Sequence, residues 1–185
     1  MTPDRRAAAR AIDAFLVAIG RDPEDPALAG TGERVADAFI DDLCAGYDVD
    51  VDRLLTENAI DGRTEVVILR DVAIATTCPH HLMTAIGTAT IAFAPRAKVV
   101  GIGALARLVD AYARRLTLQE EIGERVVESL SRALAPAWAG CRIVLAHACM
   151  TARGERRHGA RVETVALAGE CDRALVYRTL GAGST

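Results

Sequence analysis

Two short segments carry the residues whose types and spacing could do chemistry. Cys78 and His81 are separated by two residues in Cys-Pro-His-His, and Cys149 ends a His-Ala-Cys segment far downstream. Thiolate sulfur and imidazole nitrogen are ligands that Zn²⁺ prefers, and three protein ligands leave the fourth tetrahedral position open, as in catalytic zinc sites. We therefore expect Cys78, His81 and Cys149 to bind zinc that activates water for hydrolysis.

Two further histidines accompany these ligands. His80 lies directly before His81, and His147 precedes Cys149 by two residues. Because imidazole titrates near neutral pH, both are candidate proton donors or acceptors beside the metal. Taken singly, each cysteine or histidine is equally well explained as a buried structural residue. Three of the four histidines and two of the five cysteines fall in these segments, however, which favours a joint site.

The part of the chain before residue 63 is predicted to be helical. Its apolar residues recur at i, i+3, i+4 and i+7, the spacing of an amphipathic helix, at Ile12, Phe15, Leu16 and Ile19. Similar spacing predicts a second helix over residues 32–45. We expect an N-terminal helical segment over residues 1–62 and a catalytic domain over residues 63–185, together one functional unit.

The second part contains both strands and helices. Stretches rich in valine and isoleucine, or alternating in polarity, predict strands over residues 65–75, 87–93, 142–149 and 162–167. Helical spacing returns around residues 105–112 and again from residue 118. This order of hairpin, two helices and hairpin is typical of an α+β domain, an antiparallel sheet with helices on one face.

Composition narrows the class of protein. The 185 residues are 51% hydrophobic and 25% charged, which excludes a disordered or low-complexity chain. With 22 basic and 25 acidic residues the net charge is −3, so neither nucleic acid nor an anionic membrane is an expected partner. Five cysteines without a dense framework favour a reducing, cytoplasmic location. No apolar run of about 18 residues predicts a membrane span.

In order and spacing, the motifs of this chain resemble the type I GTP cyclohydrolase family from about Ile19 to Gly169. The matching text is Ile-Gly-Arg-Asp-Pro-Glu from Ile19, Gly-Glu-Arg-Val-Ala from Gly32, Cys-Pro-His-His-Leu from Cys78, Leu-Ala-Arg from Leu105, Arg-Arg-Leu-Thr-Leu-Gln-Glu from Arg114, His-Ala-Cys-Met from His147, and Arg-Gly from Arg153. Each piece is weak alone, but together they are highly specific.

The resemblance implies a tunnelling fold, in which subunits pool antiparallel strands into a barrel. A homo-oligomer, a decamer in that family, is then expected, with active sites where subunits meet. The implied reaction is hydrolytic opening of the guanine imidazole ring of GTP, loss of formate, ribose rearrangement and reclosure to 7,8-dihydroneopterin triphosphate. Such a product would feed folate or another pterin pathway.

The resemblance also implies roles for individual residues. The family's zinc ligands match Cys78, His81 and Cys149, and its catalytic histidines match His80 and His147. The carboxylate that recognises the guanine edge matches Glu120. The remaining substrate-binding positions match Gln119, Arg34, Arg107 and Arg153. Glu120 has a structural alternative, because Thr117-Leu-Gln-Glu is also a capping-box pattern at a helix start.

The match fails where the family binds triphosphate. A lysine two residues after Val35 is replaced by Asp37, and a Ser-Lys pair before Leu105 is replaced by Gly103 and Ala104. A preference for arginine would keep these charges, so the substitutions weaken phosphate binding. Two alternatives therefore stay open: a similar zinc hydrolase acting on a less phosphorylated guanine or pterin compound, and a noncatalytic zinc-binding paralogue.

Overall fold

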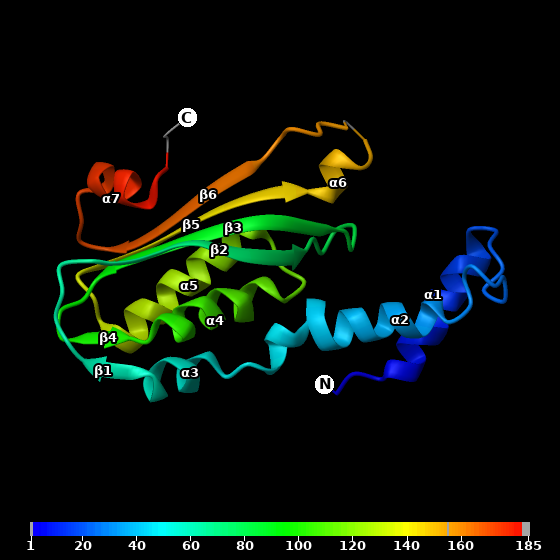
Figure 1. Ribbon diagram of the computed structural model, residues 1–185, viewed down its shortest axis with the longest axis horizontal. Coiled ribbons are helices and arrows are strands. Elements are labelled where there is room, and N and C mark those ends of the chain that lie inside the picture. The colour runs from blue at the N-terminus through cyan, green and yellow to red at the C-terminus, as the bar shows by residue number, and fades with distance from the viewer. Residues whose placement is uncertain (1, 155, 183–185) are drawn as a thin grey trace. The chain divides into compact units, whose positions relative to one another are not determined.

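The computed structural model describes residues 2–154 and 156–182, and it divides into two compact units, one up to Ala45 and one from Gly46 (Figure 1). The first unit holds α1 (Arg5–Ala18), α2 (Thr31–Asp37) and a π-helical continuation, η1 (Ala38–Leu43). The helix expected over residues 32–45 thus changes pitch after Asp37, a change that apolar spacing over so few residues does not reveal.

Contacts between α1 and α2 hold the first unit together. Arg5 pairs with Asp37 and with Asp41, the latter at 2.7 Å between Nη2 and Oδ1. Gly32 allows the close approach of the two helices, because a Cβ there would lie 2.5 Å from the carbonyl oxygen of Ala9. Asp4 begins α1 by accepting a hydrogen bond from the backbone N–H of Ala7.

The second unit is built on a four-stranded antiparallel sheet in the order β2-β3-β5-β6. Its strands are β2 (Val67–Thr77), β3 (Thr84–Ala94), β5 (Trp138–His147) and β6 (Val162–Gly169). A separate two-stranded sheet pairs β1 (Ala59–Asp61) with β4 (Lys98–Val100). The helices are a short 3₁₀ turn η2 (Ala45–Asp48), α3 (Val51–Glu57), α4 (Ile102–Ala113), α5 (Gln119–Leu134), α6 (Ala148–Thr151) and α7 (Arg173–Leu180).

The boundary between the units differs from the expected residue 62. Residues 46–62 belong with the sheet because β1 pairs with β4 and α3 packs beside α4 and α5. No periodicity in the sequence marks this, since the pairing of β1 with β4 joins segments about 40 residues apart along the chain. Among the described residues, no helix is long and apolar enough to cross a membrane.

Alternation along β3 shows which helices cover which face of the sheet. Ile91 and Phe93 are buried in the main core with α4 and α5, whereas Ala92 between them packs with Val176 and Leu180 of α7. The α+β class with an antiparallel sheet is therefore confirmed. The expectation of helices on one face holds for α4 and α5, whereas α7 covers one end of the opposite face (Figure 1). We did not predict α7, although Asp172 caps its start and Gly181 ends it.

Candidate active site

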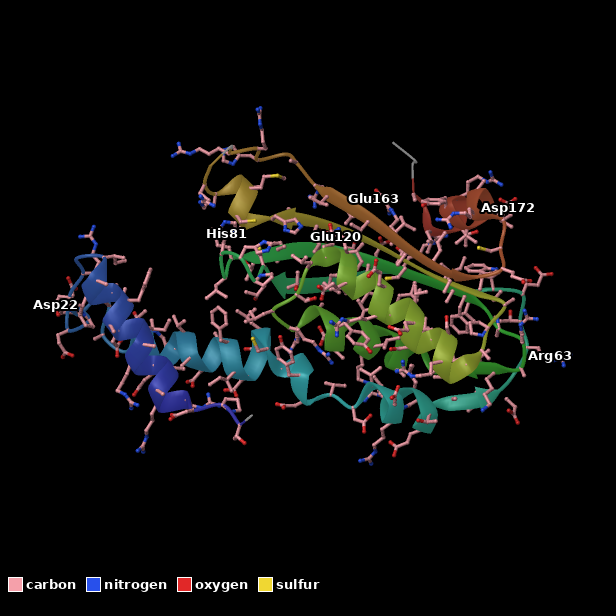
Figure 2. All side chains as sticks on the ribbon, turned by 180° about the vertical axis from the view of Figure 1, so that it is seen from behind. Asp22, Arg63, His81, Glu120, Glu163 and Asp172 are labelled. Atoms are coloured by element: carbon pink, nitrogen blue, oxygen red, sulfur yellow. The ribbon has the colours of Figure 1, made fainter. Side chains whose placement is uncertain are left out.

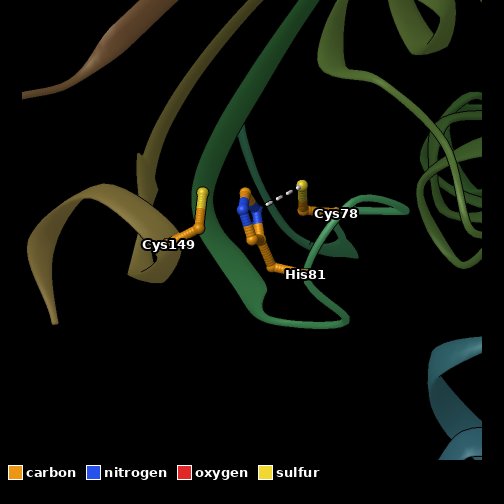
Figure 3. A group of neighbouring side chains, drawn as sticks. All are labelled: Cys78, His81 and Cys149. Carbon is orange, nitrogen blue, oxygen red and sulfur yellow. Dashed lines mark hydrogen bonds between the residues drawn. The ribbon is translucent and has the colours of Figure 1, made fainter. Parts of the chain in front are cut away.

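The three predicted metal ligands meet at one end of the second unit's sheet. Cys78 follows β2, His81 lies in the β2–β3 turn, and Cys149 lies in α6 directly after β5. Because β3 runs antiparallel to both β2 and β5, the end of each of those strands lies beside the start of β3. The ligand atoms lie within 4.8 Å of one another, with 3.9 Å between Cys78 Sγ and His81 Nδ1 (Figure 3).

Backbone hydrogen bonds shape the turn that carries two of these ligands. The N–H of Leu82 donates to the carbonyl of Cys78 at 2.9 Å, and the N–H of Cys78 donates to the carbonyl of Met83 at 3.0 Å. Leu82 has a φ of 51°, a left-handed conformation that is unfavourable for a leucine. The turn thereby returns His81 toward Cys78 instead of letting the chain run on.

The donor set fits zinc. Zinc–sulfur bonds of about 2.3 Å and zinc–nitrogen bonds of about 2.0 Å place tetrahedral ligand atoms roughly 3.5 Å apart, so small side-chain shifts suffice to enclose an ion. Burial and the neighbouring Cys78 raise the pKa of the Cys149 thiol, while the charge of Arg153 opposes that rise. A bound cation would remove the proton from such a thiol. Among the residues that the structure describes, Cys78, His81 and Cys149 form the one group of three or more Cys, His, Asp or Glu side chains that could hold a metal ion.

A hydrogen-bond network fixes His147 beside the metal ligands. The Oε1 atom of Gln119 lies 2.8 Å from Nε2 of His147. The Nε2 amide of Gln119 donates to the carbonyls of Ile143 at 3.1 Å and Val162 at 3.0 Å, and lies 3.2 Å from the hydroxyl of Thr164. Gln119 is only 3% exposed. Every polar atom of its side chain is therefore engaged within the protein.

This network determines the tautomer of His147. The two carbonyl oxygens only accept hydrogen bonds, so the atom of Gln119 that faces them must be the amide nitrogen. The amide oxygen then faces His147, and Nε2 of His147 must carry the hydrogen. In the neutral imidazole, Nδ1 is left as the acceptor. Burial lowers the pKa of His147, and the carboxylate of Glu120 partly offsets that shift.

Glu120 lies exposed in the first turn of α5, at the end of the sheet where His81 also lies (Figure 2). The capping box considered for it does not form, because the hydroxyl of Thr117 donates to Oε2 of Glu121 at 3.1 Å and Leu118 is the N-cap residue. The structural alternative for Glu120 is thus removed, and Glu120 lines a cavity.

That cavity, of about 250 Å³, gathers the predicted metal ligands, histidines and α5 residues. Its lining residues are Thr76, Cys78, His80, His81, Thr117, Leu118, Gln119, Glu120, His147, Cys149 and Val162. Sequence reasoning did not single out Thr76 or Val162 for this site. For Thr76 a signal existed: it stands two residues before Cys78, so both would face the same side of an extended strand.

The three predicted arginines do not line this cavity. Arg34 lies in the first unit, where it donates to the carbonyl of Ala29 at 3.0 Å and to the hydroxyl of Thr31 at 3.1 Å. Arg107 is exposed on α4, and Arg153 is exposed after α6. Arg153 is close enough to Cys149 for its charge to lower the pKa of that thiol.

The departures from the family's phosphate-binding pattern have local structural explanations. Asp37 is the partner of Arg5 in the first unit. Ala104 is 2% exposed and belongs to the main core, where a lysine side chain would have to be buried or displaced. Gly103 faces open space, so nothing in the described structure requires glycine there.

The fold and the site define an α+β protein with a Cys-His-Cys group that can hold a metal ion. The family profile of GTP cyclohydrolase I matches residues 8–180. A relative from Synechococcus sp. (strain JA-2-3B'a(2-13)), named GTP cyclohydrolase 1, is 38% identical over 160 residues, covering 86% of this chain and 69% of its own. One of the same name from Leifsonia xyli subsp. xyli is 37% identical over 174 residues, covering 90% and 88%. The chain belongs to the GTP cyclohydrolase I family and is a hydrolase.

Among solved structures, an archaeosine synthase QueF-Like in the apo form is similar. It has a TM-score of 0.48 and 21% sequence identity, and the match covers 60% of this chain and 100% of that chain.

Proposed function

We propose that this chain is a zinc-dependent GTP cyclohydrolase. It opens the imidazole ring of the guanine of GTP by hydrolysis, releases formate and yields 7,8-dihydroneopterin triphosphate. The observation that carries the proposal is the convergence, in one cavity, of a three-ligand metal site with His147 and Glu120. A metal site, a proton-transfer group and a carboxylate that reads the base are the parts that this reaction needs.

Cys78, His81 and Cys149 would hold the zinc ion. Bound zinc supplies Lewis acidity, which lowers the pKa of water near the reacting carbon C8. Three protein ligands leave a coordination position for such a solvent molecule, which favours an enzyme over a purely structural zinc protein. Both thiols bind metal only while reduced, which fits a cytoplasmic location.

His147 transfers protons to and from the base. Gln119 holds its Nε2–H, so Nδ1 is the nitrogen that exchanges a proton with N7 as the ring opens. Burial lowers the pKa of His147 and so favours the neutral imidazole, and the carboxylate of Glu120 opposes part of that shift. His80, exposed at the edge of the cavity, assists the later transfers. Gln119 serves as a positioning residue for His147.

Glu120 recognises the guanine edge. A carboxylate accepts the two N–H groups that guanine presents on one side, and a purine without them would leave that charge unpaired. Support comes from its position in the cavity and from the absence of a capping role, since Thr117 bonds to Glu121.

The triphosphate extends beyond the cavity. A volume of about 250 Å³ is below the roughly 300–1,000 Å³ of a small-molecule site, so the cavity accommodates the base and leaves the phosphates outside. Arg107 and Arg153 are exposed, and Arg34 is a third candidate, for contacts with phosphate. A neighbouring subunit would complete such a site.

Assembly into a homo-oligomer, a decamer as in the family, supplies that neighbour. The four-stranded sheet ends in β2 on one side and β6 on the other. Edge strands expose backbone donors and acceptors, and pairing β2 of one subunit with β6 of the next would close a barrel. Active sites would then lie between subunits.

The test incubates the zinc-loaded oligomer separately with GTP, GMP and guanosine, and follows formate release and the mass of any pterin. Formate with dihydroneopterin triphosphate from GTP is the expected result. The second candidate is a similar hydrolase for a less phosphorylated substrate, and it is supported by Asp37 and Ala104, which stand where the family has lysines. Turnover of GMP or guanosine alone would favour this candidate. Zinc binding without turnover of any of them, unchanged in H147A, would indicate a noncatalytic paralogue.

A further inference from the structure

Two buried hydroxyls at the end of β2 have no hydrogen-bond partner among the described residues. They belong to Thr76, which is 2% exposed, and Thr77, which is 0% exposed. An unpartnered buried hydroxyl is unfavourable, and valine would fill the same space on a strand without that cost. The two threonines differ in one respect: Thr76 lines the active-site cavity, and Thr77 is not among its lining residues.

The sheet register places Thr76 two strands away from His147, on the same face of the sheet. Thr76 pairs with Ala85 on β3, and Ala85 pairs with His147 on β5. Residues directly opposite one another in an antiparallel sheet face the same side, so Thr76 and His147 flank the small side chain of Ala85. Ile74, two residues earlier on β2, is buried in the core on this side. Thr76 therefore stands where the core face of β2 becomes the cavity wall.

We propose that Thr76 is a specificity-determining residue whose hydroxyl hydrogen-bonds to the purine base of the substrate. This inference rests on the proposed function and adds a contact to it. A hydroxyl both donates and accepts, so it suits the mixed polar edge of a heterocycle. The branched Cβ restricts χ1, which holds the hydroxyl in position before a ligand binds. Under the proposed function this cavity holds the base, so the base is the part of the substrate within reach of Thr76.

The test compares T76V, T76A and T76S with the matched control T77V. Removing one neutral hydrogen bond to the base should lower kcat/KM for formate release from GTP about five- to tenfold in T76V and T76A. The change should appear in KM, with kcat within about twofold of wild type, because the bond is present in both the ground state and the transition state. T76S keeps the hydroxyl but loses the branched Cβ, so its kcat/KM should lie between those of T76V and wild type. T77V removes a hydroxyl outside the cavity and should stay within about twofold of wild type.

Folding and metal content are measured on the same samples. T76V and T77V should melt at or above the wild-type temperature, since each removes an unpartnered hydroxyl, and T76A guards against a packing effect of the new methyl group. Wild-type kcat/KM in both T76V and T76A, or a loss that follows a loss of zinc, would overturn the inference. If wild type releases no formate from GTP, the proposed function fails. In that case GTP is not consumed, and its Kd can be measured directly. Equal Kd values of wild type and T76V for GTP would then overturn the inference about Thr76 separately.

Discussion

Replacing Gln119 by methionine tests whether this buried amide acts through His147 or on the substrate directly. Methionine has a similar length and lacks both the donor and the acceptor. The substitution therefore removes the 2.8 Å contact with His147 Nε2 and the two amide bonds to the carbonyls of Ile143 and Val162.

The structure sets the size of both expected effects. Three neutral hydrogen bonds at about 1 kcal/mol each predict a free energy of unfolding about 2–3 kcal/mol lower in Q119M. Losing the group that orients a general acid or base predicts a fall in kcat of about a hundredfold. T164V is the matched control, because it removes only the longest contact of the Gln119 amide, at 3.2 Å, and leaves both carbonyl bonds. Its kcat should stay within about twofold of wild type.

Denaturant unfolding at one fixed protein concentration measures stability, and initial rates of formate release measure kcat and KM. The decisive comparison is the double variant Q119M/H147A. If Gln119 works through His147, the double variant should have the same kcat as H147A, because residues that act as a unit are not additive. A further hundredfold loss in the double variant would refute this reasoning. So would a Q119M enzyme with normal kcat and a strongly raised KM, which would mean that Gln119 binds substrate itself.

Three further predictions concern the metal, the base and stability. C149A should lose tightly bound zinc and formate release together by metal analysis, whereas C171A, which changes a cysteine in the small cluster beside α7, should keep both. E120Q should lower kcat/KM for GTP about ten- to a hundredfold with an unchanged melting temperature, since glutamine replaces one acceptor oxygen by an NH2 donor that faces an N–H of the base. Equal rates would exclude the base-reading role. Arg142 holds the pKa of Glu163 below its usual range through a two-bond contact at 2.8 and 2.9 Å. The free energy of unfolding of E163Q, from denaturant unfolding, should therefore be about 0.5–1 kcal/mol lower than that of wild type above about pH 5. This difference should vanish as the pH falls through the lowered pKa of Glu163, because the wild-type carboxylate is then protonated.

Local sequence patterns predicted the strands of the four-stranded sheet to within a few residues at each end. Strands predicted over residues 65–75 and 162–167 appear as Val67–Thr77 and Val162–Gly169. The first was predicted from its valine and isoleucine content, because β-branched side chains favour extended strands. The strand predicted over residues 142–149 ends earlier, at His147, where α6 begins. That difference matters, because the helical turn carries Cys149 to the metal site.

The hydrogen-bond and ion-pair partners of individual side chains could not be predicted from the sequence. Thr117 and Glu120 have the spacing of a capping box, and only the start of α5 at Gln119 showed that Thr117 bonds to Glu121 instead. Likewise Asp37 was recognisable as a lost cation, but its pairing with Arg5 depends on how α1 packs on α2. The charge of a residue can be read from the sequence, whereas its ion-pair partner depends on how the helices pack.

The sequence by itself determined the residue types of the site, the α+β class and the family. Side-chain chemistry and periodicity are local properties, so Cys78, His81 and Cys149 could be proposed as ligands without coordinates. Only the tertiary structure decided the tautomer of His147, which Gln119 sets, and the position of Thr76 in the cavity wall. These depend on the register among three strands and on where α5 begins, since a shift of one residue would turn each side chain to the other face.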